Sequence, residues 1–235
     1  MDSSIQFWNR TAERYAKRPV ADEAAYRSKL SITQEYLRPE MDVLEIGCGT
    51  GSTALVHAPK VRTYLATDAS YRMIEIARGK LDHTNVRNLE FRVASLDDLG
   101  DLHQPFDAVL CLNLLHLLKD PKSAIEQVLG LVKPGGVFVS TTACLKDKKS
   151  WLRPVAVAAR LLRLAPFVEF LSKQELKNCL QEAGFDILHT WVPENTSDVL
   201  FAIAARPAQS TCIDRKKESF EDYRQASEEL MKGRH

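Results

Sequence analysis

The chain has 235 residues, enough for one α/β domain with further segments at its ends. Its 32 Lys and Arg residues nearly balance its 31 Asp and Glu residues, so net charge does not favour nucleic acid or an acidic surface as a partner. The five cysteines are far apart and form no C-x-x-C pair, which argues against a disulfide framework and a zinc site, and we predict no metal.

We expect neither a secretory leader nor a membrane span from the sequence. No basic segment followed by an apolar one stands at the N-terminus. No apolar run reaches the roughly 20 residues that a transmembrane helix requires. We therefore expect a cytoplasmic protein.

Residues 1–40 carry apolar residues at three- and four-residue spacings, which predicts two helices with one apolar face each. The pattern breaks near Pro19 and stops at Pro39. The simplest interpretation is that both helices pack against the edge of the main domain.

The stretch Val43–Gly51 predicts a buried strand, a tight turn and the start of a helix. Gly47, Gly49 and Gly51 stand two residues apart after the apolar run. Glycine is needed where the backbone takes a positive φ or where a ligand comes very close, and the amides beyond such a turn are unpaired donors. The segment Thr63–Asp68 then reads as a second buried strand, and it ends in a carboxylate 21 residues after Gly47. This order of elements describes a ribose site of the nucleotide type.

The nonapeptide Val43–Gly51 resembles the first motif of the class I S-adenosylmethionine-dependent methyltransferases. Asp68, followed by Ala69, Ser70 and Met73, resembles the acidic second motif of that family. The resemblance implies a cofactor site for S-adenosylmethionine in this part of the chain. Its expected members are Glu45, Gly47, Cys48, Gly49, Gly51, Asp68, Ala69 and Met73.

Some of these residues have a more specific expected role. The resemblance implies that Asp68 accepts bonds from the ribose and that Glu45 contacts the ammonium end of the cofactor, directly or through water. Cys48 is either a reactive thiol or, as we favour, a small residue that fits a crowded loop. The N-terminal pattern resembles the cap that folds over the cofactor in many small-molecule methyltransferases, which would place Tyr15 near the methionine end.

The next elements continue the alternation of helices and strands. Ser70 is a plausible cap for a helix that ends at Leu81, and Leu89–Ser95 alternates like a third strand. The family usually has an Asp beside the adenine after this strand, and Ser95 with Leu96 stands there instead. Asp97 is the alternative source of an acid.

The run Phe106–Leu112 is almost continuously apolar, which predicts a parallel strand covered on both faces. Its end resembles the fourth motif of the family, so Leu112 and Asn113 are expected on the floor between cofactor and acceptor. His116 follows them. A histidine is suited to act as a catalytic base, but a histidine within a run of leucines is more often a core residue, and both interpretations stay open.

The sequence then predicts a helix that starts with Asp120 as its cap and Pro121 at its first position. The segment Lys133–Gly136 is predicted to end this helix, and residues 137–142 to form the fifth strand.

Residues 144–170 interrupt the alternation, and we expect substrate selectivity to reside there. Between residues 151 and 166, Arg153, Arg160 and Arg163 fall on one side of a predicted helix. Three interpretations stay open: a lid whose apolar face covers an acceptor pocket, an amphipathic helix on an anionic membrane surface, or a surface helix with a solvated basic face. Position favours a lid, because loops after parallel strands surround the site.

The last elements are a helix and a pair of strands. Ser172 is predicted to cap a helix that Gly184 closes, and residues 185–192 and 199–205 are predicted strands. Beyond them, residues 207–235 form either a solvated tail or a C-terminal helix. Such a helix docks on the domain or, through its residues 212–231, on a second copy in a homodimer.

The resemblance covers about residues 41–206. It implies an α/β, Rossmann-like fold: a seven-stranded, mostly parallel sheet with helices on both faces, an antiparallel last strand, an N-terminal helical cap over residues 1–40 and a helical lid insertion at about 144–170.

The implied function is S-adenosylmethionine-dependent methyl transfer, mainly by proximity and orientation, with S-adenosylhomocysteine as the product. The pattern looks most like the ubiquinone/menaquinone-biosynthesis type, which acts on small molecules, so an aromatic, quinol or lipid-like acceptor methylated at O or C is expected. Two alternatives stay open: a non-catalytic subunit that binds the cofactor, and an NAD-dependent oxidoreductase. The second is disfavoured because Ser52 replaces the third glycine of the dinucleotide fingerprint.

Overall fold

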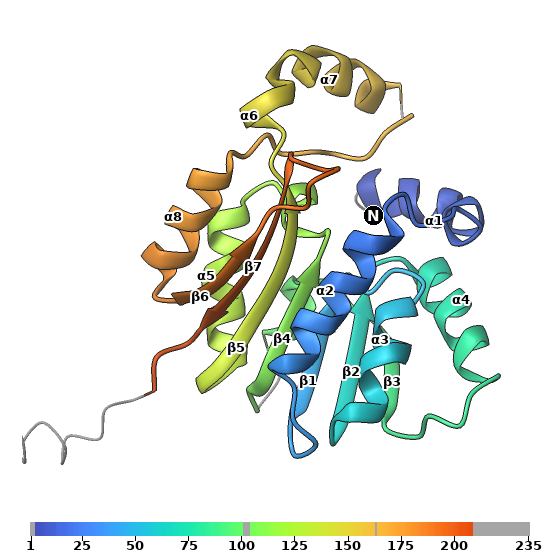
Figure 1. Cartoon of the computed structure of the whole chain (residues 1–235). Helices are drawn as coiled ribbons and strands as arrows, with labels where there is room; N and C mark the ends of the chain where they lie inside the picture. The colour runs from blue at the N-terminus through green and yellow to red at the C-terminus, as the bar shows by residue number, and fades with distance from the viewer. Residues whose placement is uncertain (1–2, 101–103, 163, 209–235) are drawn as a thin grey trace, which may run out of the picture.

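A mixed β-sheet forms the centre of the molecule (Figure 1). The computed structural model describes residues 3–100, 104–162 and 164–208. Within these residues the sheet has seven strands in the order β3-β2-β1-β4-β5-β7-β6. The strands are β1 (Asp42–Ile46), β2 (Thr63–Asp68), β3 (Leu89–Val93), β4 (Phe106–Leu112), β5 (Val132–Ala143), β6 (Asp186–Trp191) and β7 (Val199–Ala205).

The pairing of the strands confirms the predicted fold class. β3, β2, β1, β4 and β5 pair in parallel, whereas β7 runs antiparallel to both β5 and β6. Parallel neighbours need crossover connections, which is why helices separate these strands in the sequence.

Helices cover both faces of the sheet (Figure 1). One face packs against α5 (Pro121–Leu131) and α8 (Lys173–Ala183). The other packs against α3 (Ser52–His57), α4 (Tyr71–Leu81) and the end of α2 (Glu23–Glu35). The remaining helices are α1 (Ser3–Ala16), α6 (Lys146–Lys149), α7 (Arg153–Leu161) and the short 3-10 turns η1 (Ala58–Lys60), η2 (Asp97–Leu99), η3 (Leu115–Leu117) and η4 (Ser150–Leu152).

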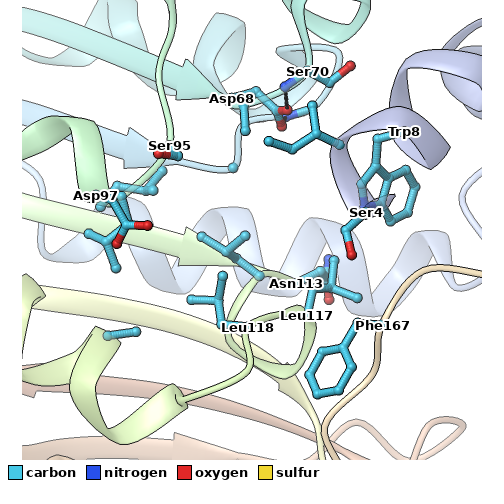
Figure 2. Close-up of a pocket in the computed structure, with 18 of the residues that line it drawn as sticks. Ser4, Trp8, Asp68, Ser70, Ser95, Asp97, Asn113, Leu117, Leu118 and Phe167 are labelled. Carbon is cyan, nitrogen blue, oxygen red and sulfur yellow. Dashed lines mark hydrogen bonds between the residues drawn. The ribbon is translucent and has the colours of Figure 1, made fainter. Parts of the chain in front are cut away.

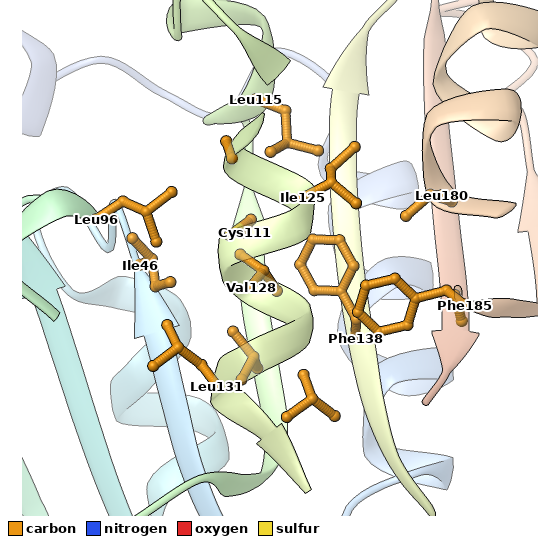
Figure 3. Close-up of a cluster of buried hydrophobic side chains, with 14 of the residues drawn as sticks. Ile46, Leu96, Cys111, Leu115, Ile125, Val128, Leu131, Phe138, Leu180 and Phe185 are labelled. Atoms are coloured by element: carbon orange, nitrogen blue, oxygen red, sulfur yellow. The ribbon is translucent and has the colours of Figure 1, made fainter. Parts of the chain in front are cut away.

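The apolar faces of the helices explain this arrangement. Ile125 and Val128 of α5 are fully buried against the sheet, where Phe138 stacks on Phe185 with ring centroids 5.4 Å apart (Figure 3). The side chains of β1 alternate between the two cores, with Leu44 on the α5 face and its neighbour on the α3 face.

The predicted helix caps are confirmed. Ser70 accepts a bond from the backbone of Met73, and Asp120 accepts one from the backbone of Ser123. Ser172 and Glu175 form a capping box at the start of α8. These local signals fix the ends of the helices that flank the strand ends.

The segment Lys133–Gly136 belongs to β5, and the prediction that it ends the preceding helix is wrong. α5 already ends at Leu131, because Val132 pairs with Phe106 of β4. The N–H of Gly135 donates to the carbonyl of Arg206 at 2.8 Å, which ties the segment to the end of β7. Gly136 allows this close pairing, since a Cβ there would lie 2.8 Å from the Asp107 carbonyl oxygen.

Three further expectations can be compared with the structure. The helix expected over residues 151–166 is shorter, with α7 ending at Leu161, and Arg163 lies outside the described residues. The C-terminal helix and the dimer contact through residues 212–231 also lie outside them. In the described part of the chain, no helix combines the length and the apolar character that a membrane crossing requires.

Candidate active site

A cavity of about 500 Å³ opens at the carboxyl ends of β1, β2 and β4 (Figure 2). Its walls come from the loops that follow these strands, from the first turns of α5, from α1 and from Phe167. Ligands of open α/β sheets bind at this edge, so the cavity is the candidate active site.

Most of the predicted cofactor residues line this cavity. They are Tyr15, Gly47, Gly49, Asp68, Ala69, Met73, Ser95, Leu96, Leu112 and Asn113. Their contacts with a bound cofactor stay a prediction.

The glycine turn has the geometry that its sequence predicts. Gly47, Gly49 and Gly51 have φ values of 72°, 55° and 75°, in the left-handed region that favours glycine. Gly51 does not line the cavity; a Cβ there would lie 2.5 Å from Cζ of Phe91, so this glycine serves packing. Cys48 is likewise buried behind the wall, where its N–H donates to the Thr67 carbonyl at 2.9 Å.

Asp68 is held in one orientation by backbone donors. The N–H of Gly49 donates to Oδ2 at 2.9 Å and the N–H of Ser70 to Oδ1 at 2.8 Å. Burial raises the pKa of Asp68, and these two donors oppose that shift. Each carboxylate oxygen has a second lone pair, so the side chain can still accept bonds from a ligand.

Glu45 lies behind the glycine turn, outside the cavity lining. Its side chain is 2% exposed, and Oε2 accepts a bond from the Tyr64 hydroxyl at 2.8 Å. Burial raises the pKa of Glu45 to about 8, so this carboxyl group is largely protonated at neutral pH. The geometry gives no direct contact with the cavity, and contact through water stays a prediction.

Ser95 and Asp97 form one end of the cavity, and Ser95 is held by Asp98, which does not line it (Figure 2). The N–H and the hydroxyl of Ser95 both donate to Oδ2 of Asp98, at 2.8 and 2.7 Å. Asp97 lines the cavity itself, so it is the acid that could accept from an adenine amine.

Asn113 marks the end of β4 with an unusual backbone. Among the described residues other than glycine, it alone has a positive φ, of 60°. Its N–H donates to the Thr141 carbonyl at 2.8 Å, which fixes the turn against β5. Asparagine tolerates this conformation better than most residues, and such strain is often found at functional sites.

His116 is not one of the described cavity-lining residues. Its Nδ1 accepts a bond from the Ala143 N–H at 3.4 Å, and its carbonyl accepts from the Glu169 N–H at 2.7 Å. Burial lowers the pKa of His116 to about 4, so the imidazole is neutral at physiological pH. A catalytic role for His116 stays a prediction.

Several lining residues were not predicted as site residues. α1 contributes Ser4 and Trp8, and the helix is held over the site because Ser70 donates its hydroxyl to Oδ1 of Asn9 at 2.7 Å and Arg72 pairs with Glu13 at 2.8 Å. α5 contributes Ser123 and Gln127, which share a face because they lie four residues apart. The spacing of these two polar residues, on a helix that follows the end of a strand, could have identified them as site residues from the sequence.

Among the described residues of the insertion, Phe167 alone lines this cavity. α7 buries none of its residues, and Leu161 is 79% exposed. α7 is therefore outside the described lining of this cavity, and its role as a lid over an acceptor pocket stays a prediction.

Residues 12–190 match the family model of the methyltransferase domain. The chain belongs to the methyltransferase-domain family. Among its relatives, the ubiquinone biosynthesis O-methyltransferase of Neisseria meningitidis serogroup C is 29% identical over 185 residues, which cover 71% of this chain and 77% of the relative. The enzyme of the same name from Thiobacillus denitrificans is 32% identical over 151 residues, 61% of this chain and 64% of its own length.

Solved structures agree with this assignment. The complex of DhpI with S-adenosylhomocysteine has a TM-score of 0.64 and 26% identity, and the match covers 88% of this methyltransferase and 96% of DhpI. The N-methyltransferase NodS of Bradyrhizobium japonicum, solved with the same ligand, has the same fold, with a TM-score of 0.62, 17% identity, and coverage of 88% of this chain and all of NodS.

The protein is therefore an S-adenosylmethionine-dependent methyltransferase, and the oxidoreductase alternative is excluded. The residues present fit the cofactor. Gly47 and Gly49 form a wall without Cβ atoms, and Asp68 presents an oriented carboxylate beside it. A volume of about 500 Å³ lies within the usual range for small-molecule sites.

Proposed function

We propose that this methyltransferase methylates a small apolar molecule, of the phenol, quinol or lipid-like type, at oxygen or carbon. The observation that carries the proposal is the composition of the cavity end opposite Ser95 and Asp97, where Trp8, Leu117 and Phe167 gather (Figure 2). Aromatic and aliphatic side chains favour an apolar acceptor of similar shape.

Bound S-adenosylmethionine supplies an electrophilic methyl group; transfer to an acceptor oxygen forms a C–O bond, breaks the C–S bond, leaves the electron pair on sulfur and releases a proton. The protein's part is to hold both molecules in line. Positioning of this kind contributes about 7–11 kcal/mol in well-oriented reactions.

The roles of the residues follow from their places in the cavity. Gly47 and Gly49 let the cofactor approach the backbone, and Asp68 accepts from its ribose. Trp8 and Phe167 close the acceptor end and keep water away from the reacting atoms. α1 supplies the first of them, so the cap completes the site.

The three described residues that gather at the acceptor end, Trp8, Leu117 and Phe167, have no side chain that can act as a base, which favours an acceptor that ionises easily. Tyr15 lines the cavity, but burial and the nearby Asp68 raise its pKa, so it is a poor base at neutral pH. A phenolic or quinol hydroxyl loses its proton much more readily than an aliphatic alcohol. The relatives named for ubiquinone biosynthesis O-methylation support the same class of acceptor.

The test is a methyl-transfer assay with radiolabelled S-adenosylmethionine and a panel of catechols, quinols and alkylated phenols. We expect at least one of these acceptors to be labelled with formation of S-adenosylhomocysteine. Asp68→Asn should lose most of this turnover, whereas Asp82→Asn, on an exposed acid away from the cavity, should retain it. Labelling of RNA or protein with no labelling of the panel would contradict the proposal.

A further inference from the structure

A second cavity, of about 520 Å³, lies between α7 and the segment Phe167–Phe170. Figure 1 shows α6 and α7 standing off the carboxyl ends of the strands, with the chain returning beneath α7 toward α8. α7 contributes Arg153, Ala156, Val157, Arg160 and Leu161 to its lining. The function proposed above uses the active-site cavity and assigns no role to this second cavity.

Phe167 connects the second cavity with the active site. Its side chain lines both cavities, and in the active site it lies at the apolar end (Figure 2). A small cavity of about 50 Å³ between α1 and residues 165–167 also includes Phe167 and Arg160 in its lining. Phe167 is therefore a wall that the cavities share, and a ligand long enough to pass it would remain in contact with the protein.

The second cavity carries positive charge from Arg153 and Arg160. In the described part of the chain, neither Arg153 nor Arg160 forms an ion pair with a carboxylate. The contrast is with three nearby lysines, whose ion pairs are Lys146 with Glu175, Lys149 with Asp198 at 2.7 Å and Lys173 with Asp147 at 2.9 Å.

The surroundings of these arginines indicate which kind of ligand they can bind. The guanidinium of Arg160 lies over the ring of Phe167, with its Cζ 4.7 Å from the centroid, so the charge stands at the junction of the two cavities. Glu169 is the single acid among the described lining residues, and its Oε1 accepts from the Phe170 N–H at 3.2 Å. Guanidinium groups match carboxylates, sulfates and phosphates through paired N–H donors.

The remaining lining is apolar and partly open to solvent. Val157 is 54% exposed and Leu161 is 79% exposed, although both line the cavity. An apolar ligand would remove this surface from water, which favours binding. The described lining thus combines an apolar wall with two arginines that form no ion pair within the described part of the chain.

We propose that this second cavity binds the distal part of the methyl acceptor, and that the acceptor is an amphiphile with an apolar body and an anionic group that pairs with Arg153 and Arg160. This assignment rests on the proposed function, because it takes the methylated end to lie in the active site. It narrows the acceptor class from apolar molecules in general to anionic ones.

A pair of fluorescent dyes tests the assignment without knowledge of the acceptor. 8-Anilinonaphthalene-1-sulfonate carries the anion, and N-phenyl-1-naphthylamine is the same aromatic framework without it. Both are titrated into the full-length protein in the presence of saturating S-adenosylhomocysteine, so that the cofactor site is occupied. We expect saturable binding of both dyes, with the sulfonate bound more tightly.

Two kinds of variant distinguish the contribution of the arginine charges to dye binding from the contribution of the cavity's shape. Arg153→Gln with Arg160→Gln should weaken binding of the sulfonate at least about tenfold and change binding of the neutral dye less than about twofold. The matched control, Arg27→Gln with Arg87→Gln, removes the same charge from two exposed sites and should bind both dyes like the wild type. Ala156→Trp fills the cavity and should weaken both dyes while leaving affinity for S-adenosylhomocysteine unchanged.

Several outcomes would overturn the assignment. They are an unchanged sulfonate affinity in the double arginine variant, loss of saturable sulfonate binding when the cofactor site is occupied, and undisturbed binding of both dyes in Ala156→Trp. Vesicles of phosphatidylglycerol provide a further arm: arginine-dependent binding to them, without discrimination between the dyes, would assign α7 to a membrane surface instead. Failure of the proposed function is recognised separately, because it would leave the phenol and quinol panel unlabelled whatever the dyes do.

Discussion

The two ends of the active site are built in different ways. The cofactor end is formed by loops that directly follow β1 and β2, and backbone donors lock its key carboxylate, Asp68, in place. The acceptor end is assembled from α1 and Phe167, which are far from each other in the sequence. None of the residues of the neighbouring helix α7 is buried. We infer that the structure of the cofactor end is fixed by the fold. The structure of the acceptor end is less constrained and can differ according to the substrate.

This difference has a physical reason. The glycine turn is covalently continuous with a central strand, so its position is determined by the hydrogen bonds of the sheet. α7 has no comparable anchor, since none of its side chains belongs to either core. Elements with few buried contacts are the ones that open and rearrange most easily.

The largest expected effect concerns the fixed half and its buried acid, Glu45. The pKa of Glu45 is raised to about 8 in the folded protein, from its ordinary value of 4.5, because the carboxyl group is buried. Its contribution to stability is therefore fully present below pH 4.5 and is lost as the pH rises through 8. Glu45→Gln keeps the shape and the bond to Tyr64 but cannot ionise, so it should exceed the wild type by on the order of 3–5 kcal/mol at pH 9 and match it near pH 4.5.

Urea unfolding of both proteins from pH 5 to pH 9 measures this difference. Parallel stability curves for wild type and Glu45→Gln would show that Glu45 is ionised in the folded state. That result would also revive a charged contact between Glu45 and the cofactor.

The next prediction compares packing in the two regions directly. Ile125 on α5 is fully buried, whereas Leu161 on α7 is 79% exposed. Ile125→Ala should cost about 2–5 kcal/mol of unfolding free energy because it leaves a cavity, whereas Leu161→Ala should change it by less than about 0.5 kcal/mol. Equal losses in urea unfolding would mean that α7 packs against the body in solution, and the contrast between the two regions would fail.

The Asp68→Ala variant tests the cofactor end of the site by removing its oriented carboxylate. Loss of a charged acceptor should cost about 1.5–3 kcal/mol of binding free energy for S-adenosylhomocysteine, or about ten- to a hundredfold in affinity. Calorimetric titration measures it, with the exposed Asp82→Ala as the control. Unchanged affinity with an unchanged melting temperature would remove Asp68 from the cofactor site.

The sequence predicted the fixed half better than the variable half, for reasons that particular residues make clear. The glycine turn and Asp68 could be predicted because each directly follows or ends a strand whose apolar residues are consecutive in the sequence. The partner of Glu45 was missed because Tyr64 approaches it across a strand pair, and β5 was started too late because Val132 pairs with Phe106. Trp8 and Phe167 line the same cavity only because of the tertiary structure, so no spacing in the sequence could indicate it.

The smallest expected effect concerns His116, which lies in η3, the turn that follows β4. Its pKa is lowered to about 4 by burial, and its Nδ1 already accepts from the Ala143 N–H, so it is a weak and occupied base at neutral pH. We expect His116→Gln to change turnover of a labelled phenol or quinol by less than about threefold, with no change in the pH at which the rate falls. A loss of about a hundredfold, with unchanged affinity for S-adenosylhomocysteine and a shifted pH profile, would show that the histidine turns into the cavity during the reaction. The loop from Asn113 to Leu118 would then belong to the variable half of the site, because it would have to move for every turnover.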